Sequence, residues 1–160
     1  KDEVLSLMVD AVAAEVPDPN PHDAPLVVVR TLAIETRGAL VRHPWAASLW
    51  LRQFPGPARV RHMEHLLASF AASDMSPRAA HLAFHAVNNH VIGYTLQEQA
   101  MAYVLAPGAD PDALARSFID GISADEFPHT VAHVQQHLDG DTASSFELVL
   151  DLLLDGLAGR

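Results

Sequence analysis

The sequence predicts an all-α protein, a single domain of about eight packed helices. Proline and glycine divide the 160 residues into pieces of helix length. Within these pieces apolar residues recur at helical spacing, and the alternation of apolar and polar residues that is typical of strands is hard to find. A chain of this length can bury roughly two-thirds of the surface that its unfolded form exposes, so it can build one core.

Prolines separate the first three predicted helices. Helix 2–16 carries apolar residues at helical spacing and stops at a proline-rich run that begins at Pro17. Helix 24–42 ends before Pro44, because proline disfavours helical geometry in the residue that precedes it. A short helix over 45–51 follows.

The next two helices also take their limits from proline. A proline–glycine–proline break precedes helix 58–73, which holds apolar residues on one side. Ser76 then offers a capping side chain, and Pro77 occupies a first helical position at which its missing N–H costs nothing. No further break occurs before Pro107, so the sequence predicts one long helix over 76–105.

Two shorter helices come next. Asp110 and Pro111 repeat the start signal of the long helix and predict a helix over 110–122. A further short helix is predicted over 130–138.

The last predicted helix, 144–159, is apolar around most of its circumference. Ser144 and Glu147 have the spacing of a capping box at its start. Glu147, Asp151 and Asp155 form one narrow acidic stripe, and leucines cover almost everything else. A surface helix needs an apolar stripe only about 100° wide to cover its own core. We therefore expect a second protein surface against this helix, the alternative being that it is central in its own domain.

The overall charge and the composition exclude several classes of function. The net charge of −10 repels phosphate, so these residues are not expected to hold nucleic acid by themselves. The absence of cysteine removes disulfides and thiolate catalysis, and it favours a cytoplasmic location. No apolar run reaches the roughly 18 residues that a membrane span needs, so no contact with a membrane is expected. The sequence begins at Lys1 without an initiator methionine, which suggests a part of a longer protein.

The ten histidines raise one alternative, a helical-bundle metalloenzyme with His85, His129 and His133 as ligands. His129, His133 and His137 recur every four residues along one helix face, and two histidines at that spacing can chelate zinc. However, Thr130 stands where a metalloprotease helix needs glutamate, and a solvent-facing helix explains the same pattern. Since no nucleophile motif such as G-x-S-x-G is present either, we expect no enzyme activity, no metal and no cofactor.

Asn88, Asn89 and His90 interrupt the long apolar helix. Asparagine is a poor helix former and costs free energy when it is buried without a partner. Three consecutive residues span about 200° of a helix, so at least one of them is expected to face inward. Asn88 shares a face with Phe84 and His85, which predicts a mixed aromatic and polar wall. A core helix with a satisfied asparagine is the alternative.

Three segments resemble, in order, the C-terminal regulatory domain of TetR-family transcriptional repressors, in the subgroup that contains the tetracycline repressor. They are GALVRHPWAASLWLRQFPGPARVRHMEHLLASF (38–70), SPRAAHLAFHAVNNHVIGYTLQEQA (76–100) and FELVLDLLLDGL (146–157). The opening KDEVLSLMVDAV is similar to the helix that follows the family's DNA-binding helix-turn-helix.

The resemblance implies the organisation of the whole protein. Residues 1–160 would form an effector-binding and dimerisation domain that encloses a small-molecule cavity. A homodimer would form through a four-helix interface made of helices 76–105 and 144–159. A helix-turn-helix domain upstream of residue 1 would bind operator DNA.

The resemblance also implies a ligand-binding site. By position, it places the following residues in or near the cavity: Leu32, Trp50, Gln53, Leu66, His85 and Asn88. Met63 and Phe84 complete the predicted lining. Trp50 stands where the tetracycline repressor uses a metal-binding histidine, and Leu32 and Leu66 replace polar contacts to the drug. We therefore expect a small apolar or aromatic effector instead of tetracycline with magnesium.

The function that follows from the resemblance is that of a ligand-responsive transcriptional repressor. An effector that fits one arrangement of the cavity helices better than another would shift helix 2–16. That shift would change the spacing of the DNA-binding heads.

Overall fold

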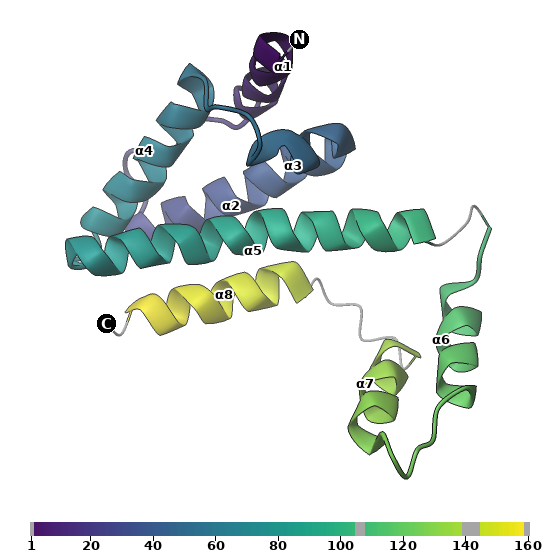
Figure 1. Cartoon of the computed structure of the whole chain (residues 1–160). Coiled ribbons are helices and arrows are strands. Elements are labelled where there is room, and N and C mark those ends of the chain that lie inside the picture. Colours follow the sequence, from purple (N-terminus) through teal and green to yellow (C-terminus); the bar gives the residue numbers. More distant parts are fainter. Residues whose placement is uncertain (1, 105–107, 139–144, 159–160) are drawn as a thin grey trace. The chain divides into compact units, whose positions relative to one another are not determined.

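The computed structural model describes residues 2–104, 108–138 and 145–158. The described residues form eight α-helices and no strand, which confirms the predicted all-α class (Figure 1). The helices are α1 (Asp2–Ala13), α2 (Pro25–Arg42), α3 (Pro44–Trp50), α4 (Pro57–Ala71), α5 (Pro77–Val104), α6 (Pro111–Asp120), α7 (Pro128–Leu138) and α8 (Ser145–Ala158).

Backbone contacts divide the chain into two compact units. Lys1–Gln99 together with Phe146–Arg160 form the larger unit, and Ala100–Ser145 form the smaller one. The larger unit holds α1 to α4, most of α5, and α8, whereas the smaller unit holds α6 and α7. The assignment of residues 1–160 to one effector-binding and dimerisation domain stays a prediction.

Proline is the commonest first residue of these helices. Six of the eight helices in the described part of the chain begin at a proline, whose fixed φ suits the first helical position. The predicted start of the seventh helix at residue 130 was wrong by two residues, because Pro128 supplies the same start signal. The capping box predicted at Ser144 lies outside the described residues.

Helix α1 ends earlier than the sequence predicted, at Ala13 instead of residue 16. The N–H groups of Glu15 and Val16 bond to carbonyl oxygens only three residues earlier, at 3.2 Å in both cases. This tightened last turn is expected ahead of Pro17, because a residue that precedes proline avoids helical geometry.

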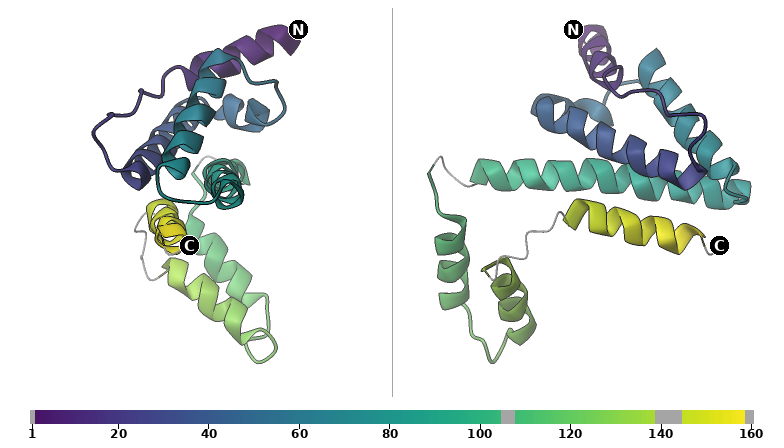
Figure 2. Two further views of the ribbon diagram at one scale, coloured as in Figure 1. Left: turned by 90° about the vertical axis from the view of Figure 1, so that its left-hand side faces the viewer. Right: turned by 180° about the vertical axis from the view of Figure 1, so that it is seen from behind.

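The core of the larger unit lies around α2, which packs against α1, α3 and α4. Figure 1 shows α5 running past these four helices, with α8 antiparallel to α5 on its other side, and both views in Figure 2 agree. The largest fully buried side chains come from α1, α2, α4, α5 and α8, and they include Leu32, Leu40, Phe70, Ile92, Phe146 and Leu150.

Helix α8 buries only one of its apolar faces within the unit. Phe146, Leu150 and Leu154 recur every four residues and are buried. Leu148 and Leu152 remain 60% and 63% exposed, so the described helices of the larger unit do not cover them. Within the larger unit, α8 is therefore not a central helix covered on all sides.

The acidic stripe of α8 faces a partner on α2. The Arg30 guanidinium donates to Asp151 Oδ1 at 2.6 Å and to Glu147 Oε2 at 2.8 Å. The hydrogen bond from Arg30 is the largest cause that lowers the pKa of Asp151. Two of the three acidic residues predicted to form the stripe thus fix α8 against α2.

His90 joins α5 to α8. Its Nε2–H donates to the carbonyl oxygen of Phe146 at 2.9 Å, and its ring stacks on the Phe146 ring with centroids 4.7 Å apart. The half-buried His90 therefore has a structural role in helix packing.

The smaller unit is built from α6 and α7. The Asp110 carboxylate accepts a hydrogen bond from the N–H of Asp112 at 3.0 Å, which confirms the predicted cap of α6. Helix α6 has no buried residue. Within the described ranges, no helix combines the length and the apolar character needed to cross a membrane.

Candidate functional site

A pocket of about 270 Å³ opens in the larger unit between α3, the loop after it, α4 and α5. This volume is slightly below the range that is typical of small-molecule sites. The lining residues are Trp50, Leu51, Gln53, Pro55, Arg59, His62, Met63, Phe84, His85, Asn88 and Asn89.

Six of the eight predicted site residues line this one pocket. They are Trp50, Gln53, Met63, Phe84, His85 and Asn88. Leu32 and Leu66 were predicted to join them, but the structure places both in the hydrophobic core, where side chains of α2 and α4 pack. They lie on core-facing positions of those helices, so they support the pocket without lining it. That the six residues bind a ligand stays a prediction.

The apolar part of the lining is largely aromatic. Trp50 is only 7% exposed at the end of α3. The Phe84 and His85 rings meet edge to face on α5, with centroids 5.3 Å apart. Asn88 is half-buried one turn further along the same helix, which places a hydrogen-bonding amide in this wall.

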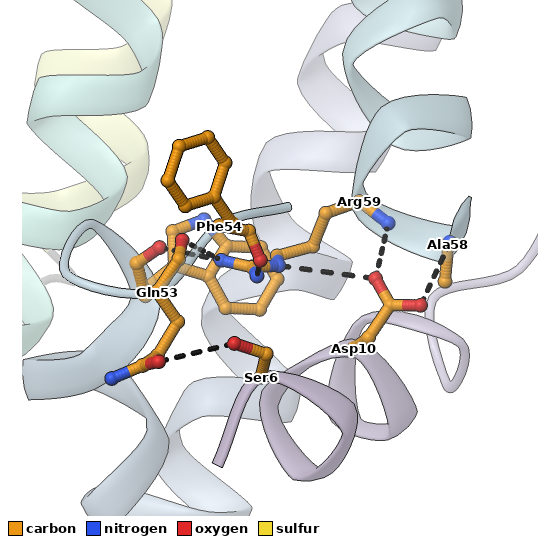
Figure 3. A network of polar contacts seen from close by, with 7 residues as sticks. Ser6, Asp10, Gln53, Phe54, Ala58 and Arg59 are labelled. Atoms are coloured by element: carbon orange, nitrogen blue, oxygen red, sulfur yellow. Dashed lines mark hydrogen bonds and ion pairs between the residues drawn. The ribbon is translucent and has the colours of Figure 1, made fainter. Parts of the chain in front are cut away.

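Arg59 is a site residue that the sequence analysis missed. Its side chain is almost wholly buried, and its guanidinium donates to the carbonyl oxygens of Trp50 at 2.8 Å, Gln53 at 3.1 Å, and Phe54 (Figure 3). Burial lowers the pKa of Arg59, and attraction by Asp10 opposes that effect. Arg59 thus holds the end of α3 and the following loop in the shape that forms one side of the pocket.

Asp10 connects the same region to α1. Its carboxylate accepts hydrogen bonds from the N–H groups of Ala58 and Arg59, at 3.0 and 2.9 Å, and so caps the start of α4. The N-cap residue Gly56 has no side chain to do this, and a Cβ at Gly56 would overlap the Asp10 carboxylate. Beside this cap, the Ser6 hydroxyl donates to Gln53 Oε1 at 3.1 Å (Figure 3).

One sequence signal could have identified this cluster. Arg59 lies in the first turn of α4, where the helix dipole disfavours a cation. A cation at that position needs an acceptor from another part of the chain, and Trp50, Gln53 and Phe54 supply it.

His62 on α4 is half-buried. It lines the described pocket and also a second pocket of about 190 Å³, to which Leu32 contributes. The Thr36 hydroxyl donates to the Leu32 carbonyl at 2.6 Å, so its oxygen can only accept from His62 Nε2–H, 3.3 Å away. Burial, and to a smaller extent His65, lowers the pKa of His62 to about 4, so the ring is neutral near pH 7.

This burial predicts a pH dependence of stability. The unfolded chain binds a proton at His62 once the pH falls below 6.5, whereas the folded chain resists protonation until about pH 4. The contribution of neutral His62 to the free energy of unfolding is therefore fully present above pH 6.5. It is lost as the pH falls from 6.5 to 4, by up to about 3 kcal/mol. Urea unfolding of His62→Gln should show a flatter pH dependence in this window. The exposed-site control His22→Gln should keep the slope of the unmodified protein, and equal slopes in all three proteins would contradict the assignment.

The described residues offer no support for the metalloenzyme alternative. No group of three or more His, Cys, Asp or Glu side chains among them is arranged to hold a metal ion. His129 and His133 are exposed on α7, and the side chain of His137 lies outside the described part of the chain.

Comparisons with known proteins agree on one family. The family model described as tetracyclin repressor-like, C-terminal domain, matches residues 20–160. An HTH-type transcriptional regulator of Saccharopolyspora erythraea is 36% identical over 99 residues, which are 58% of this chain and 40% of that protein. The chain thus spans well under half the length of this curated relative.

Solved structures show the same fold. A possible TetR family transcriptional regulator from Streptomyces coelicolor A3(2) superposes with a TM-score of 0.79 at 27% identity, covering 99% of this chain and 78% of that chain. The TetR family protein ActR of Streptomyces coelicolor, in complex with actinorhodin, gives a TM-score of 0.75 at 24% identity, over 100% of this chain and 78% of that chain. Because the family model covers most of the sequence and the helices follow the same arrangement, the chain belongs to the tetracyclin repressor-like C-terminal domain family.

Proposed function

We propose that this chain is the effector-binding and dimerisation domain of a ligand-responsive transcriptional repressor, and not an enzyme. The observation that carries the proposal is the pocket, which gathers six of the predicted side chains from α3, the loop after it, α4 and α5 and is linked to α1 through Asp10. The relative from Saccharopolyspora erythraea is a transcriptional regulator, and ActR holds a small molecule, which supports the same function here.

The proposed effector is a small aromatic or apolar compound. Trp50, Met63 and Phe84 supply apolar surface to cover its rings. Gln53, His85 and Asn88 supply polar groups that fix its orientation, as is typical of small-molecule sites.

The proposed signal runs from the pocket to α1. Gln53 lines the pocket and accepts the hydrogen bond from Ser6 on α1. Asp10, one turn further along α1, caps α4 next to Arg59, which holds the pocket loop. A ligand that moves this loop therefore acts on α1 through two polar links. A DNA-binding domain attached ahead of α1 would then change its position relative to a second copy and release or engage operator DNA.

The proposed dimer would pair α5 and α8 with the same helices of a second copy. Leu148 and Leu152 form an exposed apolar pair on α8, and Leu82 and Leu96 are exposed on α5. Gly93 lies between these α5 leucines, and a Cβ there would meet no atom of the described residues within 4 Å beyond the adjoining backbone of its own helix. Glycine inside a helix lowers stability by about 0.5 to 1 kcal/mol relative to alanine. Close packing of a partner helix against this position would explain why a glycine stands there.

A titration with biphenyl-4-carboxamide tests the proposed pocket. In a Trp45→Phe background, which leaves Trp50 as the one tryptophan, the probe should change the Trp50 fluorescence, because the indole lines the pocket. Asn88→Leu should weaken binding by about 1 to 3 kcal/mol in calorimetry, through loss of a hydrogen bond to the amide.

The matched control replaces Gln97, which is exposed on the same helix and outside the pocket. Gln97→Leu should bind the probe with unchanged affinity. A probe that leaves the Trp50 emission unchanged, or that binds Asn88→Leu and the parent protein equally well, would contradict the proposed site.

A further inference from the structure

We infer that the pocket selects by charge, taking an aromatic acid in preference to an aromatic amine of the same shape. The inference rests on the proposed function, since it concerns the effector of that same pocket. It specifies the chemical class of the effector more closely than aromatic or apolar character does.

The first observation is the absence of carboxylates from the lining. The chain contains 20 aspartate and glutamate residues and has a net charge of −10. Among the described side chains that line this pocket none is acidic, and Arg59 is the one permanently charged group. The pocket thus differs in charge from the acidic chain that surrounds it.

The second observation is the placement of the Arg59 charge. The guanidinium extends away from Asp10 toward the carbonyl groups of Gln53, which lines the pocket, and of Phe54 (Figure 3). The nearest approach of Nε to Asp10 is 3.8 Å, and that carboxylate also accepts two backbone N–H groups of α4. Arg59 therefore lines the pocket, whereas the carboxylate that offsets its charge does not. Because Arg59 is buried, water and salt screen this interaction only weakly.

The third observation concerns the uncharged polar groups. Gln53, Asn88 and Asn89 carry amide N–H groups that can donate hydrogen bonds to an anion. A ligand cation could find amide oxygens here but no opposite charge. Removing a cation from water without a counter-charge is costly, whereas an anion gains both donors and the nearby positive charge.

Three probes of matched shape test the inference: biphenyl-4-carboxylate, biphenyl-4-carboxamide and biphenyl-4-ylmethylammonium. Calorimetry at pH 7 should show the carboxylate binding at least about tenfold more tightly than the ammonium compound, a difference equal to about 1.4 kcal/mol. The carboxamide reports whether the pocket accepts the biphenyl ring system at all.

Asn88→Asp then places a carboxylate in the wall with almost no change in shape. This variant should weaken the carboxylate probe by about tenfold and tighten the ammonium probe, whereas the exposed Gln97→Glu should change neither by more than about twofold. Equal or tighter binding of the ammonium probe by the unmodified protein would overturn the charge selection and leave the proposed pocket intact, because the carboxamide would still bind. Failure of all three probes would overturn both.

Discussion

Replacing Leu152 with glutamate is expected to convert the proposed dimer into a monomer. Leu152 is 63% exposed on α8, one turn from Leu148, so the substitution leaves the core of the subunit untouched. In a two-fold interface each substitution occurs twice, and each copy would bury an unpaired carboxylate against apolar surface. At about 2 kcal/mol or more for each copy, the dissociation constant should rise by about 1,000-fold or more. Analytical ultracentrifugation at micromolar concentration would measure the change.

A matched control separates interface effects from surface effects. Val60 is 52% exposed on α4, which lies on the opposite side of α5 from α8 in Figure 1. Val60→Glu should stay dimeric. Sedimentation of the unmodified protein as a monomer at micromolar concentration, or dimerisation of Leu152→Glu with full affinity, would refute the interface on α8.

Gly93 gives an independent test of close helix approach. Gly93→Leu adds a side chain whose Cβ would meet no described atom beyond the adjoining helix backbone, so the free subunit should be stabilised by about 0.5 to 1 kcal/mol from helix propensity. The same side chain should weaken the dimer if a partner helix packs against this position. Opposite signs of the two effects would support the interface, and a Gly93→Leu dimer of unchanged affinity would contradict it.

Replacing Arg59 with methionine is expected to cost the fold about 3 to 5 kcal/mol in free energy of unfolding. The side chain is 4% exposed, and its loss leaves the carbonyl oxygens of Trp50, Gln53 and Phe54 without their donor. It also leaves the Asp10 carboxylate without a nearby positive charge. Urea unfolding followed by circular dichroism would measure the loss.

Two further variants separate the effect of the buried Arg59 from the loss of any surface arginine and from the loss of the Asp10 charge. Arg61→Met changes an exposed arginine on the same helix, so its effect should stay within about 0.5 kcal/mol. Asp10→Asn keeps an acceptor for one backbone N–H of α4 but removes the charge, so it should cost about 1 to 2 kcal/mol. A loss of less than about 1 kcal/mol in Arg59→Met would show that the buried guanidinium is not needed to hold the loop.

The sequence alone determined the helical class and most helix limits. Proline fixes its own φ and disfavours helical geometry in the residue ahead of it, so it marks helix starts and stops through bonds within a few residues. The start of α5 at Pro77, with Ser76 accepting from the N–H of Ala79 at 3.2 Å, is of this local kind. The sequence also predicted that the last helix is apolar around most of its circumference, because helical periodicity assigns each residue to a face.

Part of the candidate site was also accessible from the sequence. The polar interruption at Asn88 on an apolar helix indicated an inward-facing amide, and the family resemblance placed Trp50 and Gln53 opposite it. These residues line one pocket in the structure. Leu32 and Leu66, which the same resemblance assigned to the site, do not line this pocket and pack in the core. Similarity by position assigns a residue to a helix but does not determine how closely two helices pack around its side chain.

Only the tertiary structure decided which distant charges meet. Arg30 binds Asp151 across 121 positions of the chain, and Asp10 caps α4 from 49 positions before Arg59. Nothing in the local sequence indicates these pairs. A helical pattern gives the direction in which a side chain points from the helix axis, but it does not say which other element lies in that direction. The bonds that shape the pocket and fasten it to α1 depend on the relative placement of α1, α3 and α4, which burial of the whole core sets.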